Sequence, residues 1–499
     1  MEGGTGALRA RLAEIEDLSR TASLLAWDQQ TMMPRAGGRA RAEQSATLQR
    51  LIGERLADPE LGALIEEAAS SSEGAEPLDD QAALTRVARR DHEKAVRVPP
   101  ELRAERARAA ALGHQAWADA RERDDFAAFL PYLERNLELA RSYAACFEGD
   151  DPYDALLDDF EPDTTAAELD ARFSEIRAGL VPLIAEIAAR GVGIDDSPLR
   201  GDLPVGRQRE LVGELIAELG ASRDAWRLDA AVHPFASGIA PGDVRLTTRF
   251  DPARLGVALY STIHEFGHGL YEHGMAPELE RTPLCGGASL GIHESQSRLW
   301  ENVIGRSLPF CKWLEPRLER AFPGRGGAAA LHRAANRVEP SLIRVEADEA
   351  TYPLHIVLRF GLERDLLAGR LAARDLPGAW NEGMSELLGV EVPSDRLGVL
   401  QDVHWSEGLI GYFPTYLLGS AIAAQLWEAL AAEVPGVEAA IAAGEFGPVR
   451  EWLGENVHRH GRKLLPADLL ERATGRGFDS APYLRYLRAK YGALYGLGS

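Results

Sequence analysis

Apolar residues along this 499-residue chain recur mostly at the spacing of an α-helix. The clearest case begins at Thr165 and Glu168, which form a capping box. The stripe that follows and its glycine stop are Leu169, Phe173, Ile176, Leu180, Leu183, Ile187 and Gly191. Pro182 predicts a kink in this helix. Further stretches with helical spacing cover residues 205–220, 331–370, 417–432 and 483–491. Pro340 and Pro353 predict breaks or kinks within 331–370, and the pattern as a whole predicts a mainly α protein.

One segment alternates between apolar and polar residues instead. Within residues 243–250, Val244, Leu246 and Phe250 face one side and polar residues, including Arg245, face the other. A short turn with Pro252 then leads into another helical stretch. We therefore predict a small β-sheet element beside that helix. The strand is expected to offer a free edge to an extended peptide, or else to present an ordinary solvated face.

No passage divides the chain into separate domains. The most polar stretch, residues 70–77, is short and predicts a loop between helices. Neither an internal repeat nor a low-complexity tract is apparent. We predict one large domain over residues 1–499.

Charge and cysteine content restrict the partners and the compartment. Asp and Glu outnumber Lys and Arg by 77 to 55, a formal net charge of −22, which opposes binding to nucleic acid or an anionic membrane. The first residues lack an apolar signal core, and no run is apolar enough for a transmembrane helix. The three cysteines, Cys146, Cys285 and Cys311, are widely spaced and predict ordinary thiols in a reducing compartment. We expect a soluble, cytoplasmic protein.

His264, Glu265 and His268 form the motif H-E-x-x-H in the stretch after Pro252. On an α-helix, residues four apart share a face, so both imidazoles can reach one cation. Glu265 then projects close to that cation and can take a proton from a water bound to it. The alternative is that these side chains simply occupy a half-exposed helix face.

A catalytic zinc normally has three protein ligands and one position for water. Glycines and prolines between residues 274 and 287 predict that the motif helix ends there, and residues 292–304 predict a second helix packed beside it. Glu294 at the start of that helix is our choice for the third ligand. The competitors are Glu272, His273 and His293. Position 271 is tyrosine and position 274 is glycine, so the extended three-histidine motif is absent.

Motifs along nearly the whole chain resemble those of one family. They are the segments 25–34 (LAWDQQTMMP), 233–235 (HPF), 243–247 (DVRLT), 264–268 (HEFGH), 293–296 (HESQ), 343–348 (IRVEAD) and 398–405 (GVLQDVHW). In this order they are similar to the carboxypeptidase Taq family, metallocarboxypeptidases of the glutamate-zincin group. The resemblance implies a mostly helical fold with a deep groove, a homodimer, and a divalent metal, Zn²⁺ or sometimes Co²⁺. It also implies removal of single residues from peptide carboxyl ends with broad specificity.

The residues give a chemical account that agrees with this resemblance. A metal lowers the pKa of its water and polarises the scissile carbonyl, while Glu265 takes the proton and passes it to the leaving amine. The oxyanion needs a further donor, for which the candidates are His233, His404, Tyr412 and Tyr416.

Arg344 is the candidate clamp for the terminal carboxylate of a substrate, because a guanidinium can pair with it through two hydrogen bonds. The alternative is an i, i+4 pair with Asp348 on a helix. Arg245 carries the same ambiguity with Asp243. Asp402 or Asp348 is expected to accept the second N–H of a metal-bound histidine, with Gln401, His404 and Trp405 in the same outer shell or in a substrate wall.

Two other classes of function share these residues. An oligopeptidase would use the same metal chemistry without requiring a free terminal carboxylate. A metal-binding helical scaffold would leave Glu265 without a catalytic role.

Overall fold

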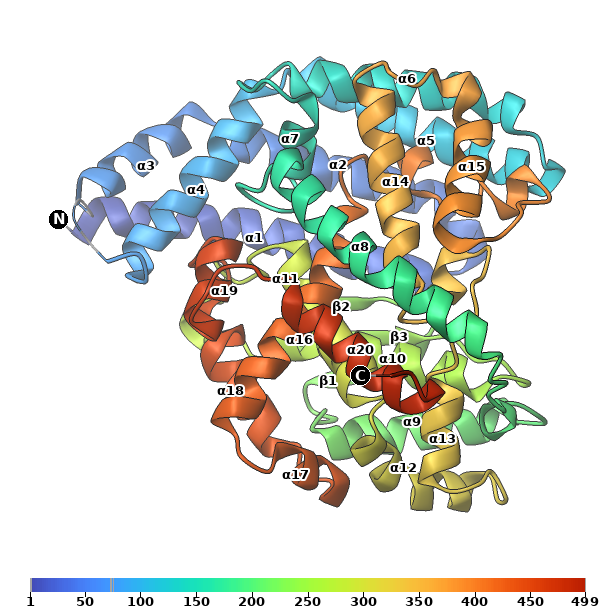
Figure 1. Cartoon of the computed structure of the whole chain (residues 1–499). Coiled ribbons are helices and arrows are strands. Elements are labelled where there is room, and N and C mark those ends of the chain that lie inside the picture. Colours follow the sequence, from blue (N-terminus) through green and yellow to red (C-terminus); the bar gives the residue numbers. More distant parts are fainter. Residues whose placement is uncertain (1, 72–73, 75, 499) are drawn as a thin grey trace. The chain divides into compact units, whose positions relative to one another are not determined.

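The computed structural model describes residues 2–71, 74 and 76–498, and helices form most of it (Figure 1). Contacts between Cα atoms group the chain into two units, each built from three separate stretches. The first unit contains Met1–Val96, Ile194–Ala335 and Ile422–Phe478, and the second contains Arg97–Gly193, Asn336–Ala421 and Asp479–Ser499. The prediction of one domain over residues 1–499 stays a prediction.

The first unit is built from helices around one small sheet. Its helices are α1 (Glu2–Thr31), α2 (Gly38–Leu56), α3 (Pro59–Ser71), α4 (Asp80–Arg97, whose last residue falls in the second unit), α9 (Val205–Leu219), α10 (Leu255–His273), α11 (Leu290–Arg298), α12 (Leu308–Ala321), α13 (Ala328–Ala335), α17 (Val437–Ala443), α18 (Gly447–Asn456) and α19 (Pro466–Thr474). α3 ends at Ser71 and α4 begins at Asp80, which agrees with the loop predicted at residues 70–77. Residues 72, 73 and 75 of this stretch lie outside the described residues.

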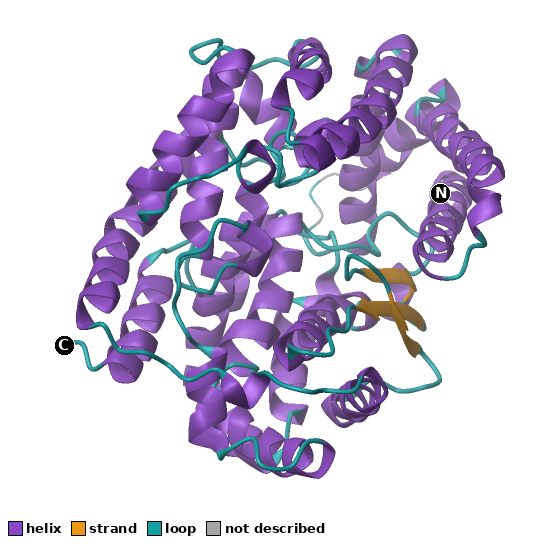
Figure 2. Ribbon diagram, turned by 90° about the vertical axis from the view of Figure 1, so that its right-hand side faces the viewer, coloured by secondary structure: helices purple, strands orange, loops and turns teal. Residues whose placement is uncertain are grey.

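The sheet contains three strands in the order β1 (Trp226–Ala230), β3 (Asp243–Thr248), β2 (Ala236–Ala240) (Figure 2). β1 runs parallel to β3, with Trp226 opposite Val244, and β2 runs antiparallel to it, with Ser237 opposite Arg245. The predicted strand is therefore real, but β3 is the central strand, and the predicted free edge is wrong. Both of its edges are hydrogen-bonded to strands that the sequence pattern did not reveal.

The burial of β3 also differs from the predicted alternation of apolar and polar faces. Val244 and Leu246 are buried as predicted, but Thr247 is buried too. Its hydroxyl accepts from the Phe235 amide at 2.8 Å and donates to the Phe235 carbonyl at 3.1 Å. A small hydroxyl side chain can thus be buried once its own hydrogen bonds are made locally.

α10 packs on β2 and β3 and is the central helix of the first unit. Its buried face includes Leu259, Ile263 and Phe266. The Phe266 ring lies 5.6 Å from Trp226 of β1 and 5.2 Å from Trp300, which follows α11. These aromatic contacts fix α10 between the sheet and the segment that follows α11.

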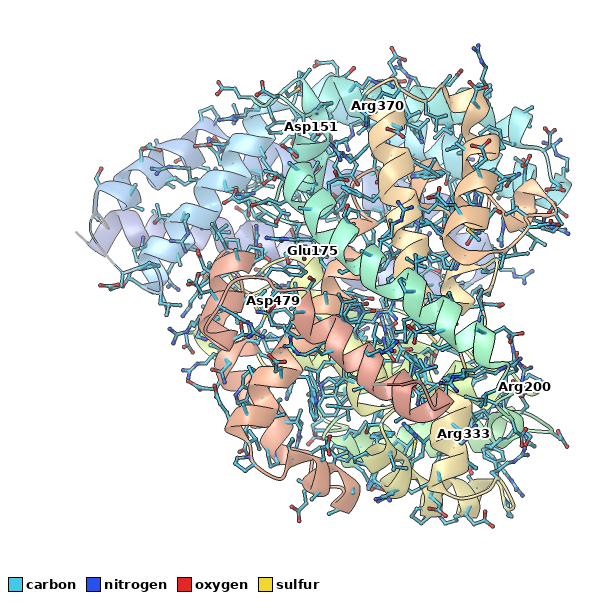
Figure 3. The ribbon with its side chains drawn as sticks, in the orientation of Figure 1. Asp151, Glu175, Arg200, Arg333, Arg370 and Asp479 are labelled. Atoms are coloured by element: carbon cyan, nitrogen blue, oxygen red, sulfur yellow. The ribbon has the colours of Figure 1, made fainter. Side chains whose placement is uncertain are left out.

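The second unit is helical. Its helices are α5 (Pro100–Arg123), α6 (Phe126–Ala144), α7 (Pro152–Leu157), α8 (Ala166–Arg190), α14 (Tyr352–Leu367), α15 (Leu376–Leu388) and α20 (Ala481–Tyr495). α16 (Pro414–Glu433) begins in this unit and ends in the first. α8 packs against α20, where the Ser480 hydroxyl, next to the labelled Asp479, donates to the labelled Glu175 at 2.6 Å (Figure 3).

Several predicted helix ends are confirmed. The capping box of Thr165 and Glu168 is formed, and Gly191 ends α8 in the left-handed conformation with φ 58°. The predicted interruption of the helix within residues 331–370 is confirmed, but it covers the whole stretch between α13 and α14. Between α13 and α14 the chain leaves the α-helix altogether and makes only a short 3₁₀ turn, Arg344–Glu346. Pro340 and Pro353 mark this interruption, which is longer than a kink.

All three cysteines are free, and Cys285 and Cys311 are buried, as predicted. No single described helix is both long and apolar enough to cross a membrane, although α16 and α17, bent by 97°, reach that length and composition together.

Candidate active site

The H-E-x-x-H motif lies in the second half of α10, which is capped at its end by Gly274, where the sequence predicts the stop. The rings of His264 and His268 lie on one face, with their centroids 4.9 Å apart. α11 runs beside α10, and the hydroxyl of its N-cap residue, Ser289, accepts from the Ile292 amide at 3.0 Å. The predicted second helix is thus confirmed, with a π-helical continuation over Leu299–Ile304.

Gly267, between the two histidines, lets α10 and α11 approach each other closely. A Cβ atom at this position would lie 2.5 Å from the Gln296 carbonyl oxygen and 2.7 Å from the Ser297 Cα. Because those atoms belong to backbone, any larger side chain would push the two helices apart. The glycine therefore sets the distance at which Glu294 meets the histidines.

Glu294 places one carboxylate oxygen against both imidazoles. Its Oε2 atom lies 3.5 Å from His264 Nε2 and 3.3 Å from His268 Nε2. Metal bonds of about 2.1 Å at tetrahedral angles put two ligand atoms about 3.4 Å apart. One atom from each residue lies within 4.8 Å of the others. The donor set and its spacing thus fit a divalent metal of the zinc type.

Other side chains fix the carboxylate of Glu294. Arg298 Nε donates to Oε1 at 2.7 Å, and the Ser297 hydroxyl donates to Oε2 at 3.0 Å. Burial works against the ionised form, but Arg298 and the two imidazoles hold the pKa of Glu294 well below its usual value. The carboxylate is therefore ionised at neutral pH and available as a ligand.

His264 donates from Nδ1 to Oε2 of Glu301 at 2.9 Å. Glu301 lies in the π-helical segment, and Arg306 donates to its other oxygen at 2.7 Å. The expectation that Asp402 or Asp348 would accept from this histidine is wrong. Glu301 was missed, although it follows Glu294 by seven residues, a spacing that returns to nearly the same helix face.

The competing ligands have other partners. His293 uses both ring nitrogens, Nδ1 with His268 Nδ1 at 2.7 Å and Nε2 with Glu272 Oε1 at 2.9 Å. His273 is exposed, and its Nδ1 donates to the Pro241 carbonyl at 2.7 Å. Glu272, with 15% of its side chain exposed, is tied to His293 instead of lying in solvent at a helix end.

Glu265 is buried beside the three candidate ligands. Burial raises its pKa to about 7, with Glu294 and Glu301 adding to the rise and His264 opposing it. Burial also opposes charge on His264, yet Glu294 and Glu301 raise the pKa of that ring above its usual value. Burial, with His293 and His264 adding to the effect, lowers the pKa of His268 to about 4, so this ring is neutral and its Nε2 can bind a metal. The cluster thus favours a positive charge beside His264, which a bound cation supplies.

Arg344 occupies a second buried cluster, within the second unit. Its Nε and Nη2 atoms contact Oδ1 of Asp402 at 2.9 and 2.8 Å, and Nη1 donates to the Tyr352 hydroxyl at 3.0 Å. Arg359 donates to Oδ2 of the same aspartate at 2.7 Å. The i, i+4 pair with Asp348 is therefore wrong. That carboxylate instead accepts from nearby backbone amides and the Thr351 hydroxyl.

Three other candidates lie beside Arg344. His404 Nε2 is 3.1 Å from the Tyr416 hydroxyl, and its ring centroid is 5.3 Å from that of Tyr412. The Arg344 guanidinium lies 4.9 Å from the centre of the Tyr416 ring. Burial, helped by Arg344, lowers the pKa of His404 to about 3, so this ring is neutral. The structure thus brings Arg344, His404, Tyr412 and Tyr416 together in one unit.

Arg245 and His233 belong to other surroundings in the first unit. Arg245 forms two hydrogen bonds of 2.8 Å to Asp243 and stacks on the Trp27 ring at 4.3 Å. Arg227 lies 4.5 Å from the same ring. His233 is exposed in the loop between β1 and β2. The alternative of an Arg245–Asp243 pair is confirmed, and the Trp27 contact was not predicted.

A helix that carries H-E-x-x-H beside a second helix that presents a glutamate is typical of zincin metallopeptidases. Residues 7–491 match the family described as carboxypeptidase Taq (M32) metallopeptidase. The chain is 43% identical to Thermostable carboxypeptidase 1 of Thermus thermophilus over 96% of either chain. It is 37% identical to Carboxypeptidase 1 of Bacillus subtilis over 97% of either chain.

The fold leads to the same family. The crystal structure of the M32 carboxypeptidase from Deinococcus radiodurans R1 matches with a TM-score of 0.95 and 41% identity, over 99% of each chain. The chain therefore belongs to the carboxypeptidase Taq (M32) family and is a metallocarboxypeptidase. The family resemblance of the sequence motifs is confirmed.

Proposed function

We propose that this metallocarboxypeptidase binds one divalent metal per chain through His264, His268 and Glu294 and releases single amino acids from peptide carboxyl ends with broad specificity. The observation that carries the proposal is the position of Glu294 Oε2, 3.5 and 3.3 Å from the two Nε2 atoms. Zn²⁺ is the proposed metal, with Co²⁺ as the alternative, because imidazole and carboxylate ligands suit both ions.

We assign the proton transfers to Glu265. When bound, the metal supplies Lewis acidity, lowering the pKa of a water and polarising the scissile carbonyl. Glu265 takes the proton of the attacking water and delivers it to the leaving amine. A pKa of about 7 suits a group that must accept and return a proton near neutral pH. Burial of this carboxyl and its place beside His264 support the assignment.

Arg344 is the proposed clamp for the terminal carboxylate of the peptide. Arg344 and Arg359 together carry two positive charges, and Asp402 offsets one of them, so the cluster keeps one net positive charge for an anion. The oxyanion donors that we consider remain His404, Tyr412, Tyr416 and His233. Arg245 is the alternative clamp, although Asp243 already engages it through two hydrogen bonds.

The remaining proposals concern the setting of the enzyme. We infer a cytoplasmic homodimer that acts on peptides through a deep groove and binds neither nucleic acid nor membranes. The net charge of −22 supports the exclusion of polyanionic partners. A single functional domain over residues 1–499 is supported because each unit takes up three separated stretches of chain.

A pair of peptides tests the proposed reaction. The metal-loaded protein is incubated with a peptide that has a free carboxyl end and with its carboxy-amidated form, and the products are followed by mass. We expect a ladder that shortens by one residue at a time from the carboxyl end of the free acid, with the amide degraded far more slowly. Equal internal cleavage of both peptides would show an oligopeptidase instead.

A further inference from the structure

The two candidate metal-binding histidines have different outer partners. His264 Nδ1 reaches the carboxylate of Glu301 directly at 2.9 Å. His268 Nδ1 meets Nδ1 of a second imidazole, His293, at 2.7 Å, and His293 Nε2 lies 2.9 Å from Glu272 Oε1. His268 therefore reaches a carboxylate only through an intervening ring.

The protons in this chain of hydrogen bonds have one consistent arrangement. His268 Nε2 faces Glu294, so it must be unprotonated to bind a metal, and the ring proton lies on Nδ1. His268 Nδ1 then donates to His293 Nδ1. The proton of a neutral His293 lies on Nε2, which donates to Glu272. Every nitrogen has one role, and the acceptor at the end is a carboxylate.

Glu272 is itself held from a distant part of the sequence. Arg20 of α1 lies 3.8 Å from Glu272 Oε2, and it donates to the carbonyl oxygens of Gly238 at 2.7 Å and of Cys285. Only 18% of the His293 side chain and 15% of the Glu272 side chain are exposed. Glu272, the last group in this series of hydrogen bonds, is thus fixed by the Arg20 guanidinium. The same guanidinium also connects α1 to β2 and to the loop before α11.

Two glycines leave room for these side chains. A Cβ atom at Gly238 would lie 2.3 Å from Glu272 Oε2, and one at Gly287 would lie 2.8 Å from His293 Cδ2. Their neighbours Gly242 and Gly286 have no such conflict, with no atom within 4 Å and with contacts of 3.4 Å or more. The backbone is therefore shaped around the two side chains at specific positions.

We propose that His293 and Glu272 are positioning residues that hold His268 in the tautomer and orientation required of a metal ligand, with Arg20 as the anchor of Glu272. The proposal rests on the metal site of the proposed function. Glu301 contacts His264 directly, whereas the His293 ring lies between Glu272 and His268. The negative charge of Glu272 is therefore further from His268 than that of Glu301 is from His264. His268 is therefore held firmly while it is less polarised than His264.

Zn²⁺ affinity measured by competition with a chromophoric chelator tests the proposal without relying on turnover. Loss of an outer partner typically costs about 10-fold to 100-fold in metal affinity, and we expect this for His293→Ala. Glu272→Gln should cost less, because the amide oxygen still accepts from His293. His293→Gln, which keeps an acceptor and a donor, should recover part of the loss. Glu278→Gln removes an exposed acidic group of the same region and should bind as the parent does.

A double variant and a glycine pair sharpen this test. Because His293 and Glu272 act in series, the variant with both His293→Ala and Glu272→Gln should bind Zn²⁺ no more weakly than His293→Ala alone. Gly238→Ala should weaken binding, whereas Gly242→Ala should not. Multiplying effects in the double variant, or parent affinity in Gly238→Ala, would contradict the serial arrangement.

Two further measurements separate the possible failures. If His264→Ala binds Zn²⁺ as the parent does, the proposed metal site is wrong regardless of His293. If His264→Ala loses the metal while His293→Ala and Glu272→Gln bind with parent affinity, the positioning role alone is overturned. Lower melting temperatures of the metal-free variants with unchanged Zn²⁺ affinity would likewise show a purely structural role.

Discussion

Each of the two units buries a carboxylate among basic side chains, and these side chains differ in kind. In the second unit, Asp402 gives Oδ1 to Arg344 and Oδ2 to Arg359, so both oxygens are engaged by groups that never lose their charge. In the first unit, Glu294 gives Oε1 to Arg298 but directs Oε2 at two imidazoles. Imidazoles can exchange a proton for a metal, so the first cluster can take up a cation, whereas the second, with its two permanent positive charges, cannot.

The largest expected effect comes from removing one candidate metal ligand from the first cluster. His264→Ala, His268→Ala and Glu294→Ala should each lose the bound metal and the activity together, because two ligands retain a divalent ion poorly. Metal content by elemental analysis and peptide turnover are the measurements. Stoichiometric metal with parent affinity in Glu294→Ala would show that the ligand is assigned wrongly.

Breaking the second cluster should affect stability instead of metal content. Asp402→Asn leaves two buried guanidiniums without their carboxylate and should lower the free energy of unfolding by about 3–5 kcal/mol, measured by urea denaturation. Asp365→Asn removes an exposed pair with Arg370, which is labelled in Figure 3, and should cost less than about 1 kcal/mol. Equal losses in the two variants would mean that burial of the Asp402 cluster has no energetic consequence.

The same cluster gives a pH dependence with a definite sign. Burial would raise the pKa of Asp402, but Arg344 and Arg359 hold it well below its usual value. The contribution of this group is therefore fully present above the unfolded pKa, about 3.9, and is lost as the pH falls below it. The parent should lose stability more steeply than Asp402→Asn between about pH 4 and pH 2.

Glu265→Gln separates catalysis from metal binding within the first cluster. The amide keeps the shape of the side chain and removes the base, so the metal should stay while kcat falls by about 10² or more. The measurement is kcat of protein that is shown to be fully metal-loaded. Near-normal turnover in that protein would remove Glu265 from the mechanism.

The smallest expected effect concerns Arg344. If Arg344 binds the terminal carboxylate of the peptide as well as Asp402, Arg344→Ala should lower kcat/KM for a free-acid peptide. The expected loss of transition-state stabilisation is about 1.5–3 kcal/mol. Arg344→Lys keeps the charge without the planar fork and should lose part of this. The ratio of free-acid to amidated turnover is the measurement, because it is insensitive to the lost pair with Asp402. An unchanged ratio would direct attention to Arg245.

The same two clusters show what the sequence could predict. His264 and His268 are four residues apart on one helix, and Glu294 is the fifth residue of the next helix, so local spacing was enough to choose them as candidate ligands. The partner of Arg344 lies 58 residues away, where no periodicity applies, and the local rule selected Asp348 instead. The partners of β3 were missed for the same reason, because β1 and β2 lack a clear alternation of their own.

Backbone proximity was equally hidden from the sequence. Gly267 reads as an ordinary residue between two histidines, and only the packing of α10 on α11 shows that a side chain there would strike the Gln296 carbonyl. Glu301 likewise reaches His264 from a π-helical segment. Helices and their caps are local properties, whereas these contacts depend on how two helices pack.

Titration of the metal-free protein with Zn²⁺, while the released carboxyl-terminal amino acid is quantified, tests whether one bound ion per chain supports the reaction. We expect no release without metal, a linear rise in rate, and saturation at one equivalent per chain. Full activity in the metal-free protein, or saturation only at two equivalents or more, would contradict a single catalytic ion held by His264, His268 and Glu294.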